Sequence, residues 1–218
     1  AVLGDARFIQ LAEAYLVKYP SGSFTLRDLP SRLAKFIRAN PRHTRPHTAL
    51  CYDLARFEWS RVEVFDTASR PVFTINDLLD VPAARQGKLK LALQPYLQLL
   101  QLDYPVDDFI LLIKREAELL RGEVSNAPTE LRQLREKKSK LPARARTCLA
   151  VHRLNNQIYF KRLEPVAYRI LLALRAGATL EAALATGIPR AKKAHPEWAG
   201  RVQTWFRTWM ELGWLCKR

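Results

Sequence analysis

The sequence of 218 residues has little cysteine and no long hydrophobic run. Its three cysteines, Cys51, Cys148 and Cys216, are odd in number, far apart and never in CxxC spacing. This pattern argues against a disulfide framework and a zinc cage and favours a reducing compartment, so we expect a cytoplasmic protein. No apolar run is longer than Phe109 to Ile113. A membrane span needs roughly 18 apolar residues, so we expect a soluble chain with no membrane partner.

The common catalytic signatures are also absent. The chain contains no GxSxG nucleophile turn, no GxxxxGK or GxGxxG phosphate loop and no HExxH zinc motif. We therefore predict that the protein is not an enzyme and has no catalytic residues, no cofactor and no bound metal. His43 and His47 have the spacing of two ligands on one helix face, but Pro41 and Pro46 indicate a loop there. Metal binding by this pair is the minor interpretation.

The whole chain has a formal net charge of +15 at pH 7, and acidic residues are scarce in its second half. The first 120 residues carry 16 Lys and Arg against 14 Asp and Glu, whereas the remaining 98 carry 20 against 7. The basic half is expected to attract an anionic partner: nucleic acid, an acidic peptide or an acidic protein face. Within it, Arg190, Lys192 and Lys193 form either a solvated loop or a contact surface.

Apolar residues at helical spacing predict helices over residues 5–19, 25–40 and 46–66. Pro30 falls inside the second pattern. Because proline is tolerated at the start of a helix and not in its interior, a start at Pro30 is the alternative for that helix. We predict an N-terminal helical bundle domain over residues 1–85. The chain begins at Ala1 without Met, so we expect that an N-terminal stretch is missing.

Beyond residue 85 the apolar period changes to alternation, which predicts a strand over residues 88–95 with residues 97–102 as its partner. A helix over residues 107–122 follows. Asp107 or Asp108 is expected to cap it, although a cation cluster with Asp103 is the alternative. Residues 122–146 are basic and poor in hydrophobic residues, and we interpret them as a partly helical, mobile connector.

The last third predicts a β-hairpin followed by three helices. Cys148–Leu154 and Gln157–Leu163 flank Asn155-Asn156, a pair that tolerates the positive φ of a tight turn. The predicted helices run from Pro165 to Gly177, from Thr179 to about Thr186, and from about Ala199 to Gly213.

Aromatic residues of the last helix invite a base-stacking interpretation. Trp205, Phe206 and Trp209 lie on the same stripe as Val202 and Leu212, however. This spacing favours packing in the core. The sequence therefore predicts an α+β protein whose C-terminal domain, residues 86–218, is winged-helix-like with a small antiparallel sheet.

The segments LEPVAYRILLALRAGATLEAAL and VQTWFRTWMELGWL, between Leu163 and Leu215, resemble the peptide-recognition elements of maturation systems for ribosomally made peptides. Such modules bind a leader peptide as an added strand between a sheet edge and the final helix. Main-chain pairing supplies the affinity, and pockets supply the choice of side chain.

Three further segments, YPSGSFTLRDLPSRLAKFI, DLARFEWSRVEVFD and LALQPYLQLLQLDYPV, resemble a bacterial family long labelled as DNA-binding and more recently described as HvfC/BufC-type peptide-modification partner proteins. The resemblance spans nearly the whole chain. Family members usually have another helical segment ahead of the part that matches Gly4-Asp5.

The resemblance implies a non-catalytic partner that presents a Cys-containing precursor peptide to a multinuclear non-haem iron oxidative enzyme. The helical half is then expected to dock on this iron-dependent enzyme subunit. The older family label implies instead a DNA-binding transcriptional regulator, and this alternative rests on analogy between folds.

Under the partner interpretation, the strand 157–163 is the edge expected to take the leader. Its apolar residues Ile158 and Phe160 are predicted to face inward and its intervening residues outward, and Arg201 and Arg207 are predicted to hold leader carboxylates. The predicted peptide-binding residues are Gln157, Ile158, Tyr159, Lys161, Arg201 and Arg207. Under the DNA-binding alternative, the contact residues are Arg190, Lys192 and Lys193.

Overall fold

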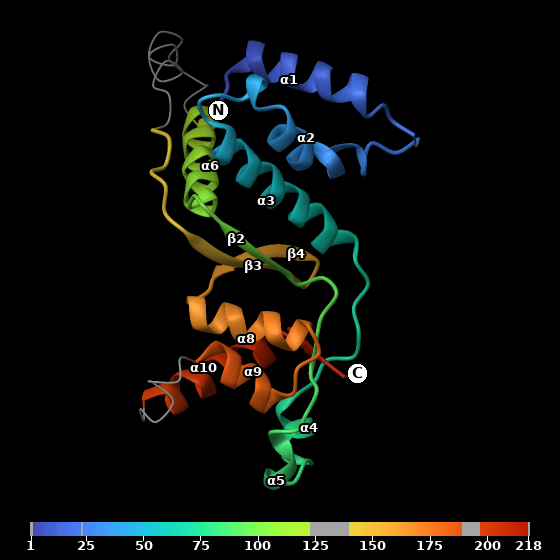
Figure 1. Ribbon diagram of the computed structural model, residues 1–218, viewed down its shortest axis with the longest axis vertical. Helices are drawn as coiled ribbons and strands as arrows, with labels where there is room; N and C mark the ends of the chain where they lie inside the picture. The colour runs from blue at the N-terminus through green and yellow to red at the C-terminus, as the bar shows by residue number, and fades with distance from the viewer. Residues whose placement is uncertain (1, 23, 123–139, 189–196, 218) are drawn as a thin grey trace. The chain divides into compact units, whose positions relative to one another are not determined.

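The computed structural model describes residues 2–22, 24–122, 140–188 and 197–217. Helices and two small sheets make up this part of the chain, so the expected α+β class is confirmed (Figure 1). The helices are α1 (Asp5–Lys18), η1 (Leu29–Arg32), α2 (Leu33–Ala39), η2 (Pro41–His43), α3 (Thr48–Asp66), α4 (Ile75–Leu79), α5 (Ala83–Gln86), α6 (Val106–Gly122), α8 (Pro165–Arg175), α9 (Leu180–Gly187) and α10 (Glu197–Glu211). The strands are β1 (Ala92–Leu93), β2 (Gln98–Leu102), β3 (Thr147–Leu154), β4 (Gln157–Arg162) and β5 (Leu215–Cys216).

The chain forms two compact units, and each contains two separate stretches of sequence. Unit 1 comprises residues 1–59 and 102–147, and unit 2 comprises residues 60–101 and 148–218. This division differs from the predicted domains 1–85 and 86–218. The reason is that α6, which follows the first sheet strands in the sequence, belongs with the N-terminal helices.

A buried carboxylate ties the start of α6 to α3. Asp53 is 3% exposed, and its Oδ2 accepts hydrogen bonds from the main-chain N–H of Asp103 at 2.6 Å and of Tyr104 at 3.1 Å. Because a buried carboxylate without partners is costly, these bonds fix the turn before α6. The helix itself begins at Val106, so Asp107 and Asp108 both lie in its first turn and neither is at the N-cap position, contrary to the expectation from the sequence.

Unit 1 contains the expected N-terminal helices, shown in blue to teal in Figure 1. The second helix is shorter than its apolar pattern: η1, which contains Pro30, comes first, and α2 begins only at Leu33. The later start that the proline offered is therefore confirmed. The buried residues that α1, α2 and α3 contribute to one cluster are Leu11, Tyr15, Phe36, Ile37 and Cys51.

The predicted hairpin in unit 2 is confirmed. Asn155 and Asn156 have φ values of 49° and 59°, and a two-residue turn with both residues in the left-handed region matches the twist of the flanking strands. β3 and β4 pair antiparallel in a register that joins Leu154 to Gln157. The three-stranded sheet has the order β2-β3-β4, so β4 is an edge strand among the described residues.

The other predicted strand pair is wrong. Only Ala92 and Leu93 of residues 88–95 form a strand, β1, and β1 pairs antiparallel with β5 near the C-terminus and not with β2. Gln94 explains the change of partner. Its main-chain N–H donates to the carbonyl of Trp214 at 2.8 Å, and its side chain bonds both main-chain groups of Arg70 at 2.8 and 2.9 Å.

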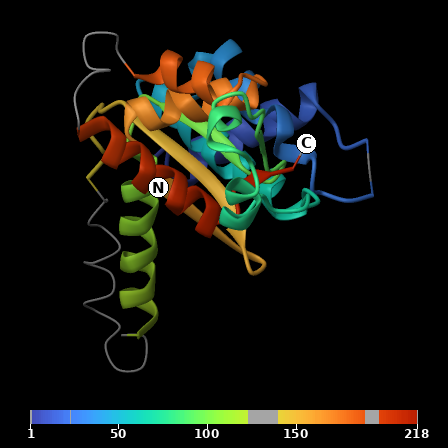
Figure 2. The same ribbon diagram turned by 90° about the horizontal axis from the view of Figure 1, so that it is seen from below.

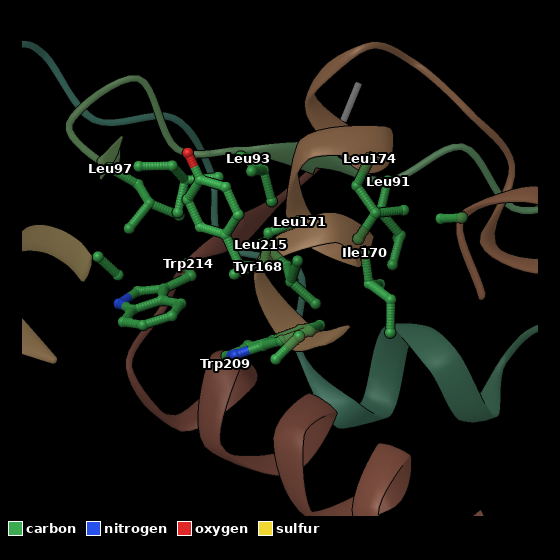
Figure 3. Close-up of a cluster of buried hydrophobic side chains, with 14 of the residues drawn as sticks. Leu91, Leu93, Leu97, Tyr168, Ile170, Leu171, Leu174, Trp209, Trp214 and Leu215 are labelled. Atoms are coloured by element: carbon green, nitrogen blue, oxygen red, sulfur yellow. The ribbon is translucent and has the colours of Figure 1, made fainter. Parts of the chain in front are cut away.

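The core of unit 2 lies between its sheets and α8, α9 and α10. Figure 3 shows Ile170, Leu171 and Leu174 of α8 gathered with leucines of the β1 region and with Trp209 of α10. Figure 2, seen from below, shows α10 in red beneath the gold strands of the hairpin. The helical stripe of α8 is confirmed by this packing, because its buried residues follow the predicted spacing.

The ends of the C-terminal helices follow their sequence signals. Thr179 accepts a hydrogen bond from the N–H of Ala182 at 3.3 Å and so caps α9 as predicted. Gly177 and Gly213 have positive φ values of 88° and 65°, beyond the ends of α8 and α10. Residues 123–139 of the predicted connector lie outside the described residues, and residues 140–146 form no helix or strand.

Candidate functional site

The hydrogen-bonding pattern of the hairpin decides which main-chain groups of β4 face outward. The N–H of Leu163 donates to the carbonyl of Cys148 at 2.9 Å, so these two residues form a hydrogen-bonded pair. Such pairs alternate along an antiparallel ladder, so His152 and Tyr159 form one as well. The N–H of Tyr159 therefore faces β3. The N–H and C=O of Ile158 point the other way, towards the outer edge of the sheet.

The side chains of β4 alternate in burial. Ile158 and Phe160 are half-buried, whereas Gln157, Tyr159 and Lys161 are exposed. The hydroxyl of Tyr159 donates to Oε1 of Gln157 at 2.7 Å. An added strand along this edge would thus meet a partly covered apolar face on one side and a mixed polar face on the other.

A buried aromatic stack lies beneath Tyr159. The ring of Tyr159 stacks on that of His152, with centroids 5.8 Å apart and an interplanar angle of 28°. His152 is 3% exposed and meets Trp214 edge to face at 5.1 Å. Burial lowers the pKa of His152 to about 4, so its imidazole is neutral near pH 7. The polar face of the edge strand consequently rests on an uncharged aromatic layer.

Arg201 is engaged within the chain. Its guanidinium forms an ion pair with the carboxylate of Glu164 and lies over the rings of Trp198 and Trp205, 4.4 and 5.5 Å from their centroids. Glu164 also accepts a hydrogen bond from Nε1 of Trp205 at 3.3 Å. Glu164 therefore already pairs with the guanidinium of Arg201 that the sequence analysis assigned to leader carboxylates.

Arg207 lies in a different environment from Arg201. It is exposed and lines a groove of about 690 Å³ between α4, α9 and α10. The two arginines are six positions apart on one helix, and at 100° per residue they point in different directions. The structure thus does not bring the predicted pair together. The apolar residues that line the groove are Ile75, Leu78, Leu180, Leu184, Val202, Phe206 and Met210.

The last helix contributes mainly to packing, as its stripe predicted. Trp209 is 1% exposed, and Trp205 and Phe206 are half-buried. Arg190, Lys192 and Lys193, the contact residues of the DNA-binding alternative, lie outside the described residues.

The cysteines and histidines do not form a reactive or metal-binding cluster in the part of the chain that the structure covers. All three cysteines are buried and none forms a disulfide, and burial raises the pKa of the Cys51 thiol to about 11. His43 stacks on the ring of Phe36 with centroids 5.9 Å apart. Among the described residues, no three His, Cys, Asp or Glu side chains gather as ligands for a metal ion.

Two residues of this surface were not among those predicted from the sequence. His152 could have been placed, because a two-residue turn at Asn155-Asn156 fixes the register that puts it opposite Tyr159. Glu164 gave no such signal. Its partner Arg201 lies 37 positions away, and only the packing of α10 brings the two together.

No protein-family model matches the chain, and no curated protein matches it at a significant level. None of the helices in the described ranges is both long and apolar enough to cross a membrane.

Proposed function

We propose that this chain is a non-catalytic partner protein that binds the leader of a ribosomally made precursor peptide and presents it to a multinuclear non-haem iron oxidative enzyme. The leader adds as a strand to the outer edge of β4. The observation that carries the proposal is the position of β4 at the edge of its sheet, with the main chain of Ile158 directed outward. The resemblance to peptide-recognition elements supplies the class of ligand.

The side chains around this edge support a peptide ligand. Main-chain groups at a sheet edge pair with any extended peptide, whereas alternate side chains distinguish one peptide from another. Ile158 offers a half-buried apolar contact, and Tyr159 and Lys161 offer an aromatic ring and a cation on the opposite face. A leader with alternating apolar and acidic or polar residues fits this arrangement.

The proposal assigns the affinity mainly to main-chain pairing. Since Arg201 is paired with Glu164 and Arg207 lines the separate groove, neither supports a carboxylate contact beside β4. Lys161 and Arg162 are the cations of the edge strand itself. An exposed ion pair contributes less than about 1 kcal/mol, so we expect the main-chain pairing to dominate binding.

The experiment is a titration of a fluorescently labelled leader peptide, the N-terminal part of a Cys-containing precursor to be sought among the short reading frames beside the gene, against three proteins. Ile158→Pro removes the outward-facing donor but none of the bonds to β3, and proline is tolerated on edge strands. Ile158→Val is the matched control, because it changes the side chain and keeps the N–H. We expect the proline variant to bind roughly tenfold more weakly, which corresponds to about 1.4 kcal/mol, and the valine variant to bind like the wild type.

Circular dichroism of each variant shows whether the fold is kept. Equal affinity of all three folded proteins would exclude strand addition at β4. Absence of leader binding by the wild type, with the iron enzyme present or omitted, would contradict the partner function. Specific nanomolar binding of one duplex DNA sequence near physiological salt would favour the regulator instead.

A further inference from the structure

A second candidate for a binding surface is a stretch of unit 1 whose charge is strongly one-sided. Between Leu29 and Tyr52 the chain contains five Lys or Arg residues and no Asp or Glu. All five are exposed. We call them the basic strip; they are Arg32, Lys35, Arg38, Arg42 and Arg45.

Aromatic rings hold two of these cations in place. The guanidinium of Arg32 lies over the ring of Tyr19, 5.3 Å from its centroid. That of Arg38 lies over Tyr52 at 5.6 Å, with Arg56 over the same ring at 5.4 Å. A guanidinium stacked on a ring keeps its N–H groups available at its edge, and it loses less conformational entropy when an anion binds.

A hollow lies within the strip. It has a volume of about 470 Å³ and is lined by Ser31, Ala34, Lys35, Arg38, Ala39 and Tyr52. The small side chains of Ala34 and Ala39 leave room for an apolar side chain from outside. Lys35 and Arg38 stand beside that space as cations, so an apolar group and a carboxylate can be accommodated next to each other.

Large apolar side chains are exposed near the strip in the sequence and the fold. Val17 is 86% exposed and Leu26 is 71% exposed. A second hollow is lined by residues from the two segments that contain Val17 and Leu26, among them Tyr15, Tyr19 and Arg32. Exposed apolar residues beside arginines and tyrosines are typical of protein interfaces, whereas a phosphate backbone makes no use of them.

We propose that the basic strip and its hollow bind an acidic amphipathic segment of a partner protein. Carboxylates of that segment pair with Arg32, Lys35 and Arg38, and one of its apolar side chains enters the hollow between Ala34 and Ala39. Charge complementarity selects the class of partner, since Lys35 and Arg38 line the hollow within the strip and no acidic residue is among its lining residues. The inference goes beyond the proposed function, because it concerns unit 1 and does not involve β4.

The test measures the fluorescence anisotropy of a labelled synthetic peptide whose Glu and Leu residues lie on opposite faces of a helix. The comparison ligands are a peptide of the same composition in scrambled order and a single-stranded oligothymidylate. The triple variant Arg32→Gln/Lys35→Gln/Arg38→Gln removes three positive charges from the strip. The matched control Arg85→Gln/Lys88→Gln/Lys90→Gln removes three exposed positive charges from unit 2.

We expect the amphipathic peptide to bind the wild type and the control more tightly than the scrambled peptide, and to bind the triple variant at least tenfold more weakly. Equal affinity for the ordered and scrambled peptides, or an equal loss in both variants, would overturn the proposal. Tighter binding of the oligothymidylate that depends on the strip would make it a nucleic-acid site. If the triple variant loses its helical circular dichroism, the single variant Lys35→Gln takes its place. Leader binding at β4, measured on the same variants, is expected to stay unchanged, which separates this test from that of the proposed function.

Discussion

His152 of β3 and Tyr159 of β4 lie directly opposite each other and stack their rings at 5.8 Å, on the face of the hairpin next to the buried Trp214. The neutral imidazole in this stack makes the stability of unit 2 dependent on pH. Burial lowers the pKa of His152 in the folded state to about 4, below the value of about 6.5 expected in the unfolded chain. Protons therefore bind the unfolded state preferentially between these two values.

The first prediction follows from the sign of this difference. The contribution of the neutral His152 to the free energy of unfolding should be complete above pH 6.5. It should fall by up to about 3 kcal/mol as the pH decreases towards 4. His152→Phe keeps an aromatic ring in the stack but cannot titrate, so we expect a flatter profile in that range. Urea unfolding at a series of pH values measures the effect. Parallel profiles for the wild type and the phenylalanine variant would show that His152 does not cause the dependence.

The second prediction concerns the buried Asp53 of unit 1. Asp53→Ala leaves the main-chain N–H groups of Asp103 and Tyr104 without their acceptor, so we expect a loss of about 2 to 4 kcal/mol in the free energy of unfolding. Asp53→Asn keeps one carbonyl oxygen and should cost less. Thermal or denaturant unfolding of the three proteins provides the comparison, and an alanine variant as stable as the asparagine variant would contradict the role given to these bonds.

A pair of glycines provides the third prediction. A Cβ at Gly187 would overlap the side chain of Ile170 and lie 3.1 Å from the carbonyl of Val166, so Gly187→Ala should destabilise the packing of α9 on α8 by about 1 to 3 kcal/mol. A Cβ at Gly200 in α10 would meet no atom of the described residues within 4 Å. Gly200→Ala should instead stabilise the chain by about 0.5 to 1 kcal/mol. Shifts of the same sign in the unfolding midpoint would be inconsistent with this packing.

Elements defined by local signals were predictable from the sequence. The hairpin follows from two asparagines between alternating segments, and the start of α9 follows from its threonine cap, because each signal acts within a few residues. The stripe of α8 was likewise visible, since its buried residues recur at helical spacing.

Arrangements that depend on distant partners were not predictable. β1 pairs with β5, more than 100 positions away, because Gln94 bonds to Trp214 and Arg70. The assignment of α6 to unit 1 depends on the side chain of Asp53. Neither contact appears in the hydrophobic periodicity of the sequence, because each joins residues that are far apart. The same holds for the pairing of Arg201 with Glu164.

Amide hydrogen exchange at two neighbouring residues of β4 tests strand addition most directly. In the free protein the N–H of Tyr159 faces β3 and should exchange slowly, whereas that of Ile158 faces the outer edge and should exchange fast. When the leader peptide is added to saturation, NMR-detected exchange should slow markedly at Ile158, because its N–H then donates to the added strand, and should change little at Tyr159. Fast exchange of Ile158 in a complex that demonstrably contains the bound leader would contradict the proposed site.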